Sequence, residues 1–191
     1  MSPVEATFTA WGAWTLSWIA AAFWSDRAEK RPARSEEWLY RIVTFAGAFL
    51  LFRPAFPHAG AGYPLWTIGP AAQWALFWVV LVGLAFAWWA RLRLGRLWSS
   101  SVTKKAGHHV VDTGPYAIVR HPIYTGILLA AAATAGQQGT LRGVAGMLAL
   151  ALGFWIKARL EERFLSEQLG AADYAAYRRR VPMLTPFGLR S

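Results

Sequence analysis

Long apolar runs, separated by short polar segments, predict membrane-spanning helices in the first half of the chain. Residues 6–25 carry no charge and are rich in Ala and Trp. Because a bilayer core of about 30 Å takes about 20 helical residues, this run predicts a first span. Residues 38–52 predict a second span with Arg41 as its only charge, and residues 71–90 predict a third. The Pro- and Gly-rich residues 57–64 predict the loop between the second and third spans.

Two shorter apolar runs follow in the second half of the chain. Residues 124–135 and 143–156 predict a fourth and a fifth helix, joined by a turn at residues 136–140. Small residues on both helices, namely Ala130–Ala133, Gly143, Gly146 and Gly153, predict that the two helices approach each other closely. Both helices are short, so two interpretations stay open: the hairpin crosses the bilayer, or it enters the bilayer only in part.

The composition leaves two classes of protein. The 191 residues are 55% hydrophobic and only 16% charged, yet the net charge is +10, and the mean hydropathy is +0.28. So much apolar and aromatic content excludes a disordered chain. A chain that is both apolar and basic is either a membrane protein with basic flanks or a basic nucleic-acid binder.

The positions of the basic residues favour the membrane protein. With five spans, the first and third connections and the C-terminal segment share one side of the membrane. All of the 20 Lys and Arg residues except Arg53 and Arg142 fall near that side. The positive-inside rule then predicts an N-terminus outside and a cytoplasmic C-terminus. The bilayer therefore accounts for the charge, and we expect no nucleic acid as a partner.

The sequence lacks the residues and motifs that several kinds of functional site require. There is no cysteine, which excludes disulfides, thiolate metal sites and a cysteine nucleophile. Neither a Rossmann fingerprint nor a phosphate-binding P-loop occurs. His108, His109 and His121 are too few and too poorly spaced for a metal site, so we expect no metal.

One polar segment at the cytoplasmic side is residues 113–126. Gly114 and Pro115 predict a turn, and Pro122 predicts the first residue of a helix. Arg120 and His121 would then lie just before a helix N-terminus, where backbone N–H groups converge. This arrangement predicts an anion pocket at the membrane edge. The alternative is a snorkelling arginine beside a solvated histidine.

A second polar segment begins where the fifth predicted helix ends. Arg159 and Glu162 are three residues apart, so they can form a local ion pair. Glu161 and Glu162 point about 100° apart on a helix, so one can face a pocket while the other takes a structural partner. Acidic residues this close to the membrane are costly and are often functional, although an ordinary charged helix exit is the alternative. Further on, Asp173 predicts the start of a short amphipathic helix on the membrane surface.

The motifs in these segments resemble those of a known family. They are Gly114-Pro115-Tyr116, Arg120-His121-Pro122-x-Tyr124-x-Gly126, Arg159-x-Glu161-Glu162 and Gly170-x-x-x-Tyr174-x-x-Tyr177-x-x-x-Val181-Pro182. In this order they resemble the isoprenylcysteine carboxyl methyltransferase family, over about residues 90–187. That family belongs to a wider group of integral-membrane methyltransferases, which includes phospholipid N-methyltransferases. With five predicted spans, the chain resembles the family's short prokaryotic members. The resemblance therefore implies a prokaryotic inner membrane as its location.

The resemblance implies the architecture and the cofactor. It implies one all-α membrane domain over residues 1–191, with three transmembrane helices in 1–90 and the catalytic half in 91–191. S-adenosylmethionine would bind without a Rossmann domain, in a cytoplasmic pocket. The connection between the third and fourth helices and the C-terminal segment would build this pocket, with an entry for a lipid tail from the bilayer.

The resemblance also implies roles for individual residues. The cofactor-binding residues would be Tyr116, Arg120, His121, Pro122, Tyr124 and Glu162. The catalytic residues would be Arg159, Glu161 and Glu162. A carboxylate acceptor is already a nucleophile and needs no base, whereas an amine acceptor needs Glu161 or Glu162 to remove a proton. The sequence leaves this choice open.

Other functions remain as alternatives. The most direct expectation is methyl transfer to a lipophilic carboxylate of the isoprenylcysteine type, with no obligate protein partner. A phospholipid or a small thiol could be the acceptor instead. A sterol-type membrane reductase would use NADPH and need a site for the 2′-phosphate, which Arg178–Arg180 could supply. A non-enzymatic membrane protein would use Arg120, His121 and Glu162 structurally.

Overall fold

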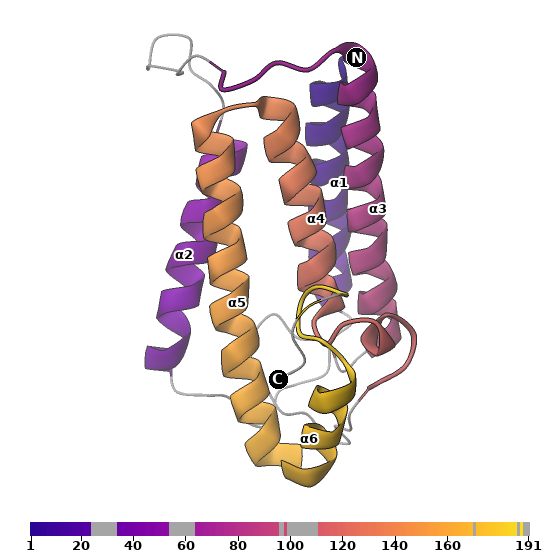
Figure 1. The fold of residues 1–191 in the computed structure, drawn as a ribbon, viewed down its shortest axis with the longest axis vertical. Helices are drawn as coiled ribbons and strands as arrows, with labels where there is room; N and C mark the ends of the chain where they lie inside the picture. The colour runs from indigo at the N-terminus through magenta and orange to yellow at the C-terminus, as the bar shows by residue number, and fades with distance from the viewer. Residues whose placement is uncertain are drawn as a thin grey trace.

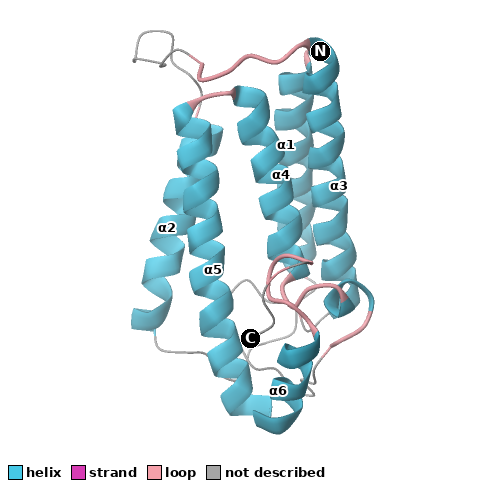
Figure 2. Cartoon of the chain, viewed as in Figure 1, coloured by secondary structure: helices cyan, strands magenta, loops and turns pink. Residues whose placement is uncertain are grey.

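The computed structural model describes residues 1–23, 34–53, 64–95, 98, 111–169, 171–186 and 188, apart from the side chains of 34–36, 168, 169 and 171–173. Within these residues every regular element is helical, as predicted (Figure 2). The elements are α1 (Pro3–Ala22), α2 (Arg34–Phe52), α3 (Pro70–Leu94), the 3-10 helix η2 (Gly114–Ala117), α4 (Pro122–Gln138), α5 (Leu141–Leu169) and α6 (Ala171–Arg180).

Helices α1 to α5 run side by side along the long axis, and the short α6 lies at one end of the bundle (Figure 1). Helix α2 packs on α5, α3 packs on α4, and α1 packs mainly on α3. The N-terminus lies at the end opposite α6, so α2 and α4 begin, and α1, α3 and α5 finish, at the end that holds α6. We call this the α6 end.

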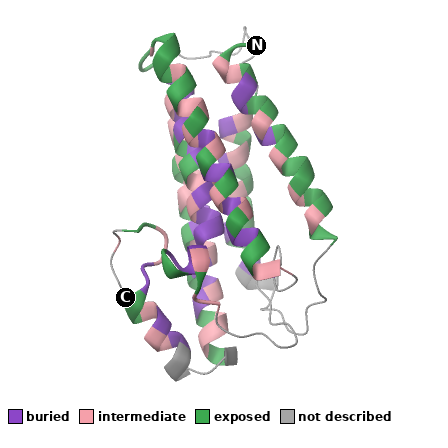
Figure 3. Ribbon diagram, turned by 90° about the vertical axis from the view of Figure 1, so that its right-hand side faces the viewer, coloured by how far each residue is buried: buried purple, intermediate pink, exposed green. Residues whose placement is uncertain are grey.

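Large apolar side chains cover the outside of the bundle. Examples on four different helices are Leu16 (70% exposed), Phe45 (73%), Trp78 (62%) and Leu148 (57%). Figure 3 shows exposed positions recurring along the outer helix faces, with the buried positions turned inward. Soluble monomers rarely expose so much contiguous apolar surface, so this surface indicates contact with lipid.

Among the described residues, two helices are long and apolar enough to cross a membrane, namely α3 and residues 141–167 of α5. This finding agrees with a membrane-associated chain. The five predicted helices are all present among the described residues. That all five cross the bilayer stays a prediction, and so does the loop at 57–64, of which only Pro64 is described.

The sequence-based prediction for the end of the fifth helix is wrong. Helix α5 does not end near residue 156 but continues to Leu169. Glu161 and Glu162 therefore lie on regular helix. Between Gly153 and Gly170 the sequence has neither glycine nor proline, and its Leu, Ala, Arg and Glu residues favour a helix despite their charge. The turn before α5 is also shorter than predicted, because α4 runs on to Gln138. Gly139 ends α4 with a left-handed φ of 60°.

Glycines set the closest contacts between helices. A Cβ atom added to Gly83 of α3 would lie 2.5 Å from the carbonyl oxygen of Gly126 on α4. One added to Gly146 of α5 would lie 2.9 Å from the carbonyl oxygen of Gly47 on α2. The small residues therefore pack α4 against α3 and α5 against α2. The prediction that Gly146 and Gly153 bring α4 and α5 together is wrong, because Gly153 faces Thr44 of α2.

Substituting alanine for Gly126 is expected to lower the free energy of unfolding by about 1–3 kcal/mol, because the new methyl group forces α3 and α4 apart. Thermal unfolding in detergent measures the effect. Gly12→Ala is the matched control, because an added Cβ at Gly12 meets no atom within 4 Å. Equal melting temperatures for the two variants would contradict the close contact.

Three tryptophans of α1 share one face, and that face packs into the bundle. The indole N–H of Trp11 donates to Oγ1 of Thr134 at 3.0 Å. The indole N–H of Trp14 donates to the carbonyl oxygen of Leu84 at 3.2 Å. Trp14 and Trp18 stack with ring centroids 4.5 Å apart. This stripe therefore anchors α1 to α3 and α4.

Candidate functional site

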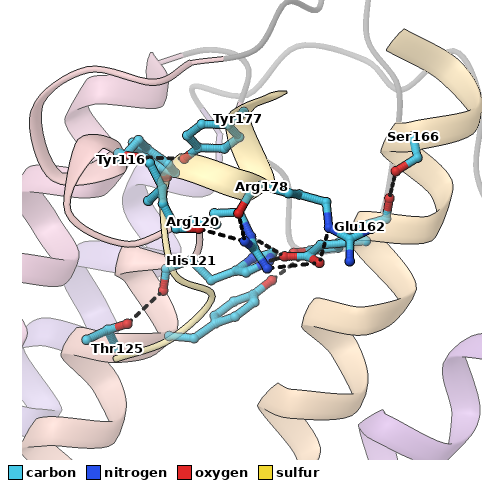
Figure 4. A network of polar contacts seen from close by, with 11 residues as sticks. Tyr116, Arg120, His121, Thr125, Glu162, Ser166, Tyr177 and Arg178 are labelled. Atoms are coloured by element: carbon cyan, nitrogen blue, oxygen red, sulfur yellow. Dashed lines mark hydrogen bonds and ion pairs between the residues drawn. The ribbon is translucent and has the colours of Figure 1, made fainter. Parts of the chain in front are cut away.

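A polar network at the α6 end joins the start of α4 to residues 178–184, which we call the C-terminal segment, and to α5 (Figure 4). The backbone N–H of Arg120 donates to the Pro182 carbonyl at 2.9 Å, and that of His121 donates to the Met183 carbonyl at 3.1 Å. Thr125 Oγ1 donates to the Leu184 carbonyl at 2.6 Å. These bonds hold residues 182–184 across the first turn of α4.

The side chain of Arg120 is fully buried at the centre of this network. Its Nε donates to Glu162 Oε1 at 2.6 Å and its Nη2 donates to Glu162 Oε2 at 3.3 Å. Its Nη1 donates to the carbonyl oxygens of Arg178 at 2.8 Å and of Val181 at 2.6 Å. Arg120 thus ties α4, α5 and the C-terminal segment together. The predicted anion pocket does not form at Arg120, because protein acceptors take up its guanidinium group.

Local sequence explains why Arg120 and His121 lie here. Gly114 begins η2 with a φ of 62°, which turns the chain back toward the bundle. Pro122 is the first residue of α4 and His121 is its N-cap, as the sequence predicted. Pro122 is completely buried, so its visible role is to start the helix.

His121 lies between the two glutamates of α5. Its Nδ1 is 3.4 Å from Glu161 Oε2, and its Nε2 is 3.3 Å from Glu162 Oε1. The hydroxyl of Tyr124 donates to Glu161 Oε1 at 2.7 Å. The side chain of Glu162 is 3% exposed and that of Glu161 is 17% exposed. Glu162 is therefore the structural carboxylate of the pair, and Glu161 is the more open one.

The charge state of His121 depends on these two carboxylates. Burial alone would lower the pKa of His121 below its usual 6.5, but hydrogen bonds to Glu161 and Glu162 outweigh burial and raise that pKa. A protonated ring donates from both nitrogens, which suits two acceptors. The two carboxylates therefore favour the imidazolium form of His121.

Stability is expected to fall with rising pH because of His121. The unfolded chain has the ordinary histidine pKa of about 6.5, so the stabilisation is complete below about pH 6.5 and is lost as pH rises through the raised pKa. Thermal unfolding in detergent between pH 6 and pH 9 measures this decline. The His121→Gln variant is expected to show a shallower decline, and equal slopes would contradict the charge assignment.

Aromatic rings continue the site into the bundle. His121 stacks on Tyr124 with centroids 5.4 Å apart and planes 5° apart, and Tyr124 stacks on Phe154 at 4.8 Å. The Nζ of Lys157 lies 5.2 Å from the centroid of Tyr124 and 5.6 Å from that of Tyr40. The ring of Tyr124 thus contacts His121, Phe154 and Lys157, and its hydroxyl donates to Glu161.

Tyrosines also hold the C-terminal helix in place. The hydroxyl of Tyr177 on α6 donates to the carbonyl oxygen of Tyr116 at 2.7 Å. Burial raises the pKa of Tyr116, Tyr174 and Tyr177 well above the usual range, so these phenols stay protonated. Tyr174 and Tyr177 pack with Val181 in a small apolar cluster. The predicted short helix is confirmed, with both tyrosines turned inward.

His121, Tyr124, Glu161 and Glu162 form a group of contacting side chains that we call the His121 cluster. Arg159 lies apart from this cluster. It is exposed and lies over Trp155, with its guanidinium carbon 5.4 Å from the ring centroid. The sequence allowed a local ion pair between Arg159 and Glu162. In the structure, Glu162 pairs with Arg120 instead. The structure therefore brings together Arg120, His121, Tyr124, Glu161 and Glu162, but not Arg159.

Sequence reasoning missed two polar features at this end. Tyr40 and Lys157 approach the cluster from α2 and α5. A signal for Tyr40 is its position in the polar first turns of α2, between Glu37 and Arg41. Arg91 is completely buried and donates to the carbonyl oxygens of Gly95 at 2.6 Å and Ala21 at 2.8 Å. It thereby joins the ends of α1 and α3. In the described part of the chain, no group of three His, Asp or Glu side chains could hold a metal ion.

Comparison with known families and proteins supports the motif-based assignment. Residues 74–167 match the isoprenylcysteine carboxyl methyltransferase (ICMT) family, a segment that includes α4 and nearly all of α5. The chain is also similar to the cobalt-zinc-cadmium resistance protein CzcN of Cupriavidus metallidurans, with 30% identity over 148 residues. That match covers 76% of this chain and 60% of the relative. The His121 cluster therefore lies within the part of the chain, residues 74–167, that matches the isoprenylcysteine carboxyl methyltransferase family.

Proposed function

We propose that this protein transfers a methyl group from S-adenosylmethionine to a lipophilic acceptor at the membrane. The observation that carries the proposal is the His121 cluster. It joins an imidazole, two carboxylates and a tyrosine at one end of a lipid-facing bundle, within the segment that matches the methyltransferase family. A polar site at the edge of an apolar bundle suits a polar cofactor and an apolar acceptor.

The residues of the cluster fit the cofactor in their chemistry. S-adenosylmethionine supplies a methyl group on a cationic sulfonium, and it carries an ammonium group and ribose hydroxyls. Glu161 is the open carboxylate of the cluster, so it would hold the ammonium group or the hydroxyls. His121 and Tyr124 orient Glu161, and the buried ring of Tyr116 would form a wall of the site.

Arg120 and Glu162 would act without touching the cofactor. Their buried ion pair holds the C-terminal segment over the start of α4. A closed segment excludes water from the reacting groups and fixes their alignment, which can contribute several kcal/mol to catalysis. Arg120 is thus proposed as a positioning residue rather than as the ligand that its motif suggested.

The acceptor is proposed to be a carboxylate of the isoprenylcysteine type. Such a group is a nucleophile at neutral pH, so the protein needs only to align it and to keep it dry. Arg159 at the membrane edge could bind it through two parallel hydrogen bonds. An amine acceptor, as in phospholipid methylation, would instead need Glu161 to accept a proton.

A binding experiment and a transfer experiment test the proposal. Calorimetry in detergent compares S-adenosylhomocysteine with NADPH, and we expect only the former to bind. Labelled methyl transfer then surveys prenylcysteine analogues, phosphatidylethanolamine, small thiols and native lipid extracts. Binding of NADPH alone would favour a membrane reductase. Neither cofactor binding nor transfer to any acceptor would favour a non-enzymatic membrane protein.

The orientation belongs to the proposal as well. We place the α6 end on the cytoplasmic side of a prokaryotic inner membrane, because the described basic residues gather there, whereas Arg53 and Arg142 lie at the other end. A fluorescent reporter fused after residue 191 is expected to fold in the cytoplasm and emit. A silent reporter on an abundant, membrane-inserted fusion would reverse the orientation.

A further inference from the structure

Lys157 is a charged residue that the proposed site leaves unexplained. It lies on α5 within the apolar stretch 141–167, which is long enough to cross a membrane. Its Nζ is 5.2 Å from the ring centroid of Tyr124 and 5.6 Å from that of Tyr40, so α2 and α4 both contribute to its surroundings. Ionisable side chains at membrane depth are costly and are often functional. Its position therefore indicates a role beyond packing.

The place of Lys157 along α5 fits a ligand with an apolar tail and a charged head. Phe154, Lys157 and Glu161 follow one another at spacings of three and four residues, so they share one face of the helix. Tyr124 contacts this face along its length. Its ring stacks on Phe154 at 4.8 Å and lies 5.2 Å from the Nζ of Lys157, and its hydroxyl donates to Glu161. Toward the α6 end, the face is thus apolar, then cationic, then anionic.

The depth of Lys157 suits an acceptor that comes from the bilayer. Four residues of helix rise about 6 Å, and α5 finishes at the α6 end, so Lys157 lies one turn farther into the bundle than Glu161 (Figure 1). Glu161 is the carboxylate proposed to hold the cofactor. A cation one turn deeper would hold the head of a molecule whose tail stays among the apolar helices.

Arg159 is less well placed for this role. It lies about 200° around the helix from Lys157, since the two are two residues apart. Its guanidinium group lies over Trp155, away from the His121 cluster. A lysine also acts as a point charge, whereas an arginine takes both oxygens of a carboxylate in paired hydrogen bonds. A carboxylate held at one oxygen keeps its other oxygen open for attack on a methyl carbon.

We propose that Lys157 binds the carboxylate of the lipophilic acceptor and thereby selects an acid over a neutral lipid. This inference rests on the proposed methyl transfer to a carboxylate. In that transfer one carboxylate oxygen forms a bond to the methyl carbon, the carbon–sulfur bond breaks, and its electron pair stays on sulfur. The ester product is neutral, so it loses its ionic contact with Lys157. An ammonium group has three N–H donors, so this role is compatible with the contacts that Lys157 already makes.

Calorimetry of the full chain in detergent, with excess S-adenosylhomocysteine, tests this role. The probes are an S-prenylated N-acetylcysteine and its carboxamide, which is similar in size but uncharged. We expect the wild type to bind the acid at least about tenfold more tightly than the amide, because only the acid accepts a hydrogen bond between two charged groups. Lys157→Gln is expected to lose this preference, whereas Lys157→Arg keeps the charge and is expected to retain most of it.

A control variant and a kinetic measurement separate binding from a structural role. Arg142→Gln is the matched control, because it removes a positive charge at the other end of α5, and it is expected to keep the preference. In transfer assays, Lys157→Gln is expected to raise KM for the acid by about tenfold and to leave KM for S-adenosylmethionine unchanged. A merely structural lysine would instead weaken the binding of acid and amide equally in Lys157→Gln, and that result would overturn the inference.

The remaining contrary results have distinct meanings. Equal binding of acid and amide to the wild type would overturn the inference. A preference that is lost in Arg159→Gln but kept in Lys157→Gln would assign the carboxylate to Arg159 instead. Binding of S-adenosylhomocysteine without any binding of the acid would overturn the role of Lys157 and leave the proposed methyl transfer standing. Acid binding that depends on Lys157, without S-adenosylhomocysteine binding, would support the site and refute the methyl transfer.

Discussion

Substituting methionine for Arg120 is expected to lower the free energy of unfolding by about 3 kcal/mol, at the low end of values for broken buried ion pairs. The variant loses both hydrogen bonds to Glu162 and those to the carbonyl oxygens of Arg178 and Val181. It also leaves a buried carboxylate without its main partner. His121 and Arg178 remain near Glu162 and limit the loss.

Unfolding in detergent by denaturant measures this effect. Arg179→Met is the matched control on the exposed side of α6 and is expected to change stability by less than about 0.5 kcal/mol. The double variant Arg120→Met with Glu162→Leu is expected to recover much of the loss, because no unpaired buried charge remains. Additive losses in the double variant would contradict a shared ion pair.

Hydrogen exchange gives a second reading of the Arg120 variant. If Arg120 holds the C-terminal segment on α4, amide exchange in residues 181–184 is expected to quicken more than exchange within α3. A uniform increase over the whole chain would indicate a general loss of stability instead.

Substituting glutamine for Glu161 is expected to lower kcat/KM for methyl transfer by about 100-fold, because the open carboxylate of the cluster is lost and the cofactor is misaligned. The amide of the new side chain still offers an oxygen to the Tyr124 hydroxyl, so the fold is expected to persist. Transfer of labelled methyl and binding of S-adenosylhomocysteine are measured together. Both are expected to weaken, whereas the melting temperature changes little.

Asp112→Asn is the matched control for Glu161. Asp112 is a carboxylate at the α6 end, but its side chain is 41% exposed and pairs only with Arg180 in the described structure. This variant is expected to keep wild-type kcat/KM. A Glu161→Gln protein with full activity, or an equal loss in Asp112→Asn, would remove Glu161 from the proposed site.

The helices themselves were predictable because their signals are local. Long apolar runs predicted α1, α2 and α3 within a few residues of their ends, and Pro122 predicted the start of α4. The predicted fifth helix, residues 143–156, was too short because the charged residues after Ile156 were interpreted as the end of the helix. Charged residues with good helix propensity continue a helix wherever no glycine or proline interrupts it.

The partners of the site residues were not predictable. The motif placed Arg120, His121 and Tyr124 together on one segment and Glu161 and Glu162 together on another. Which groups meet across α4, α5 and the C-terminal segment depends on tertiary packing. Local spacing favoured Arg159 for Glu162, whereas the fold buries Arg120 against it. A buried charge requires a close partner, and only the assembled bundle brings that partner from a distant segment.

The sequence by itself determined that the chain is helical, that its basic residues gather at one end and that its motifs match one family. Hydrophobic period, charge placement and short motifs are all read along the chain. Only the tertiary structure decided that α4 packs on α3 and α5 on α2, through Gly83, Gly126, Gly47 and Gly146. Only it decided that Arg120 is buried against Glu162, whereas the side chain of Glu161 remains 17% exposed. These choices depend on which surfaces exclude solvent from one another, and that property belongs to the fold as a whole.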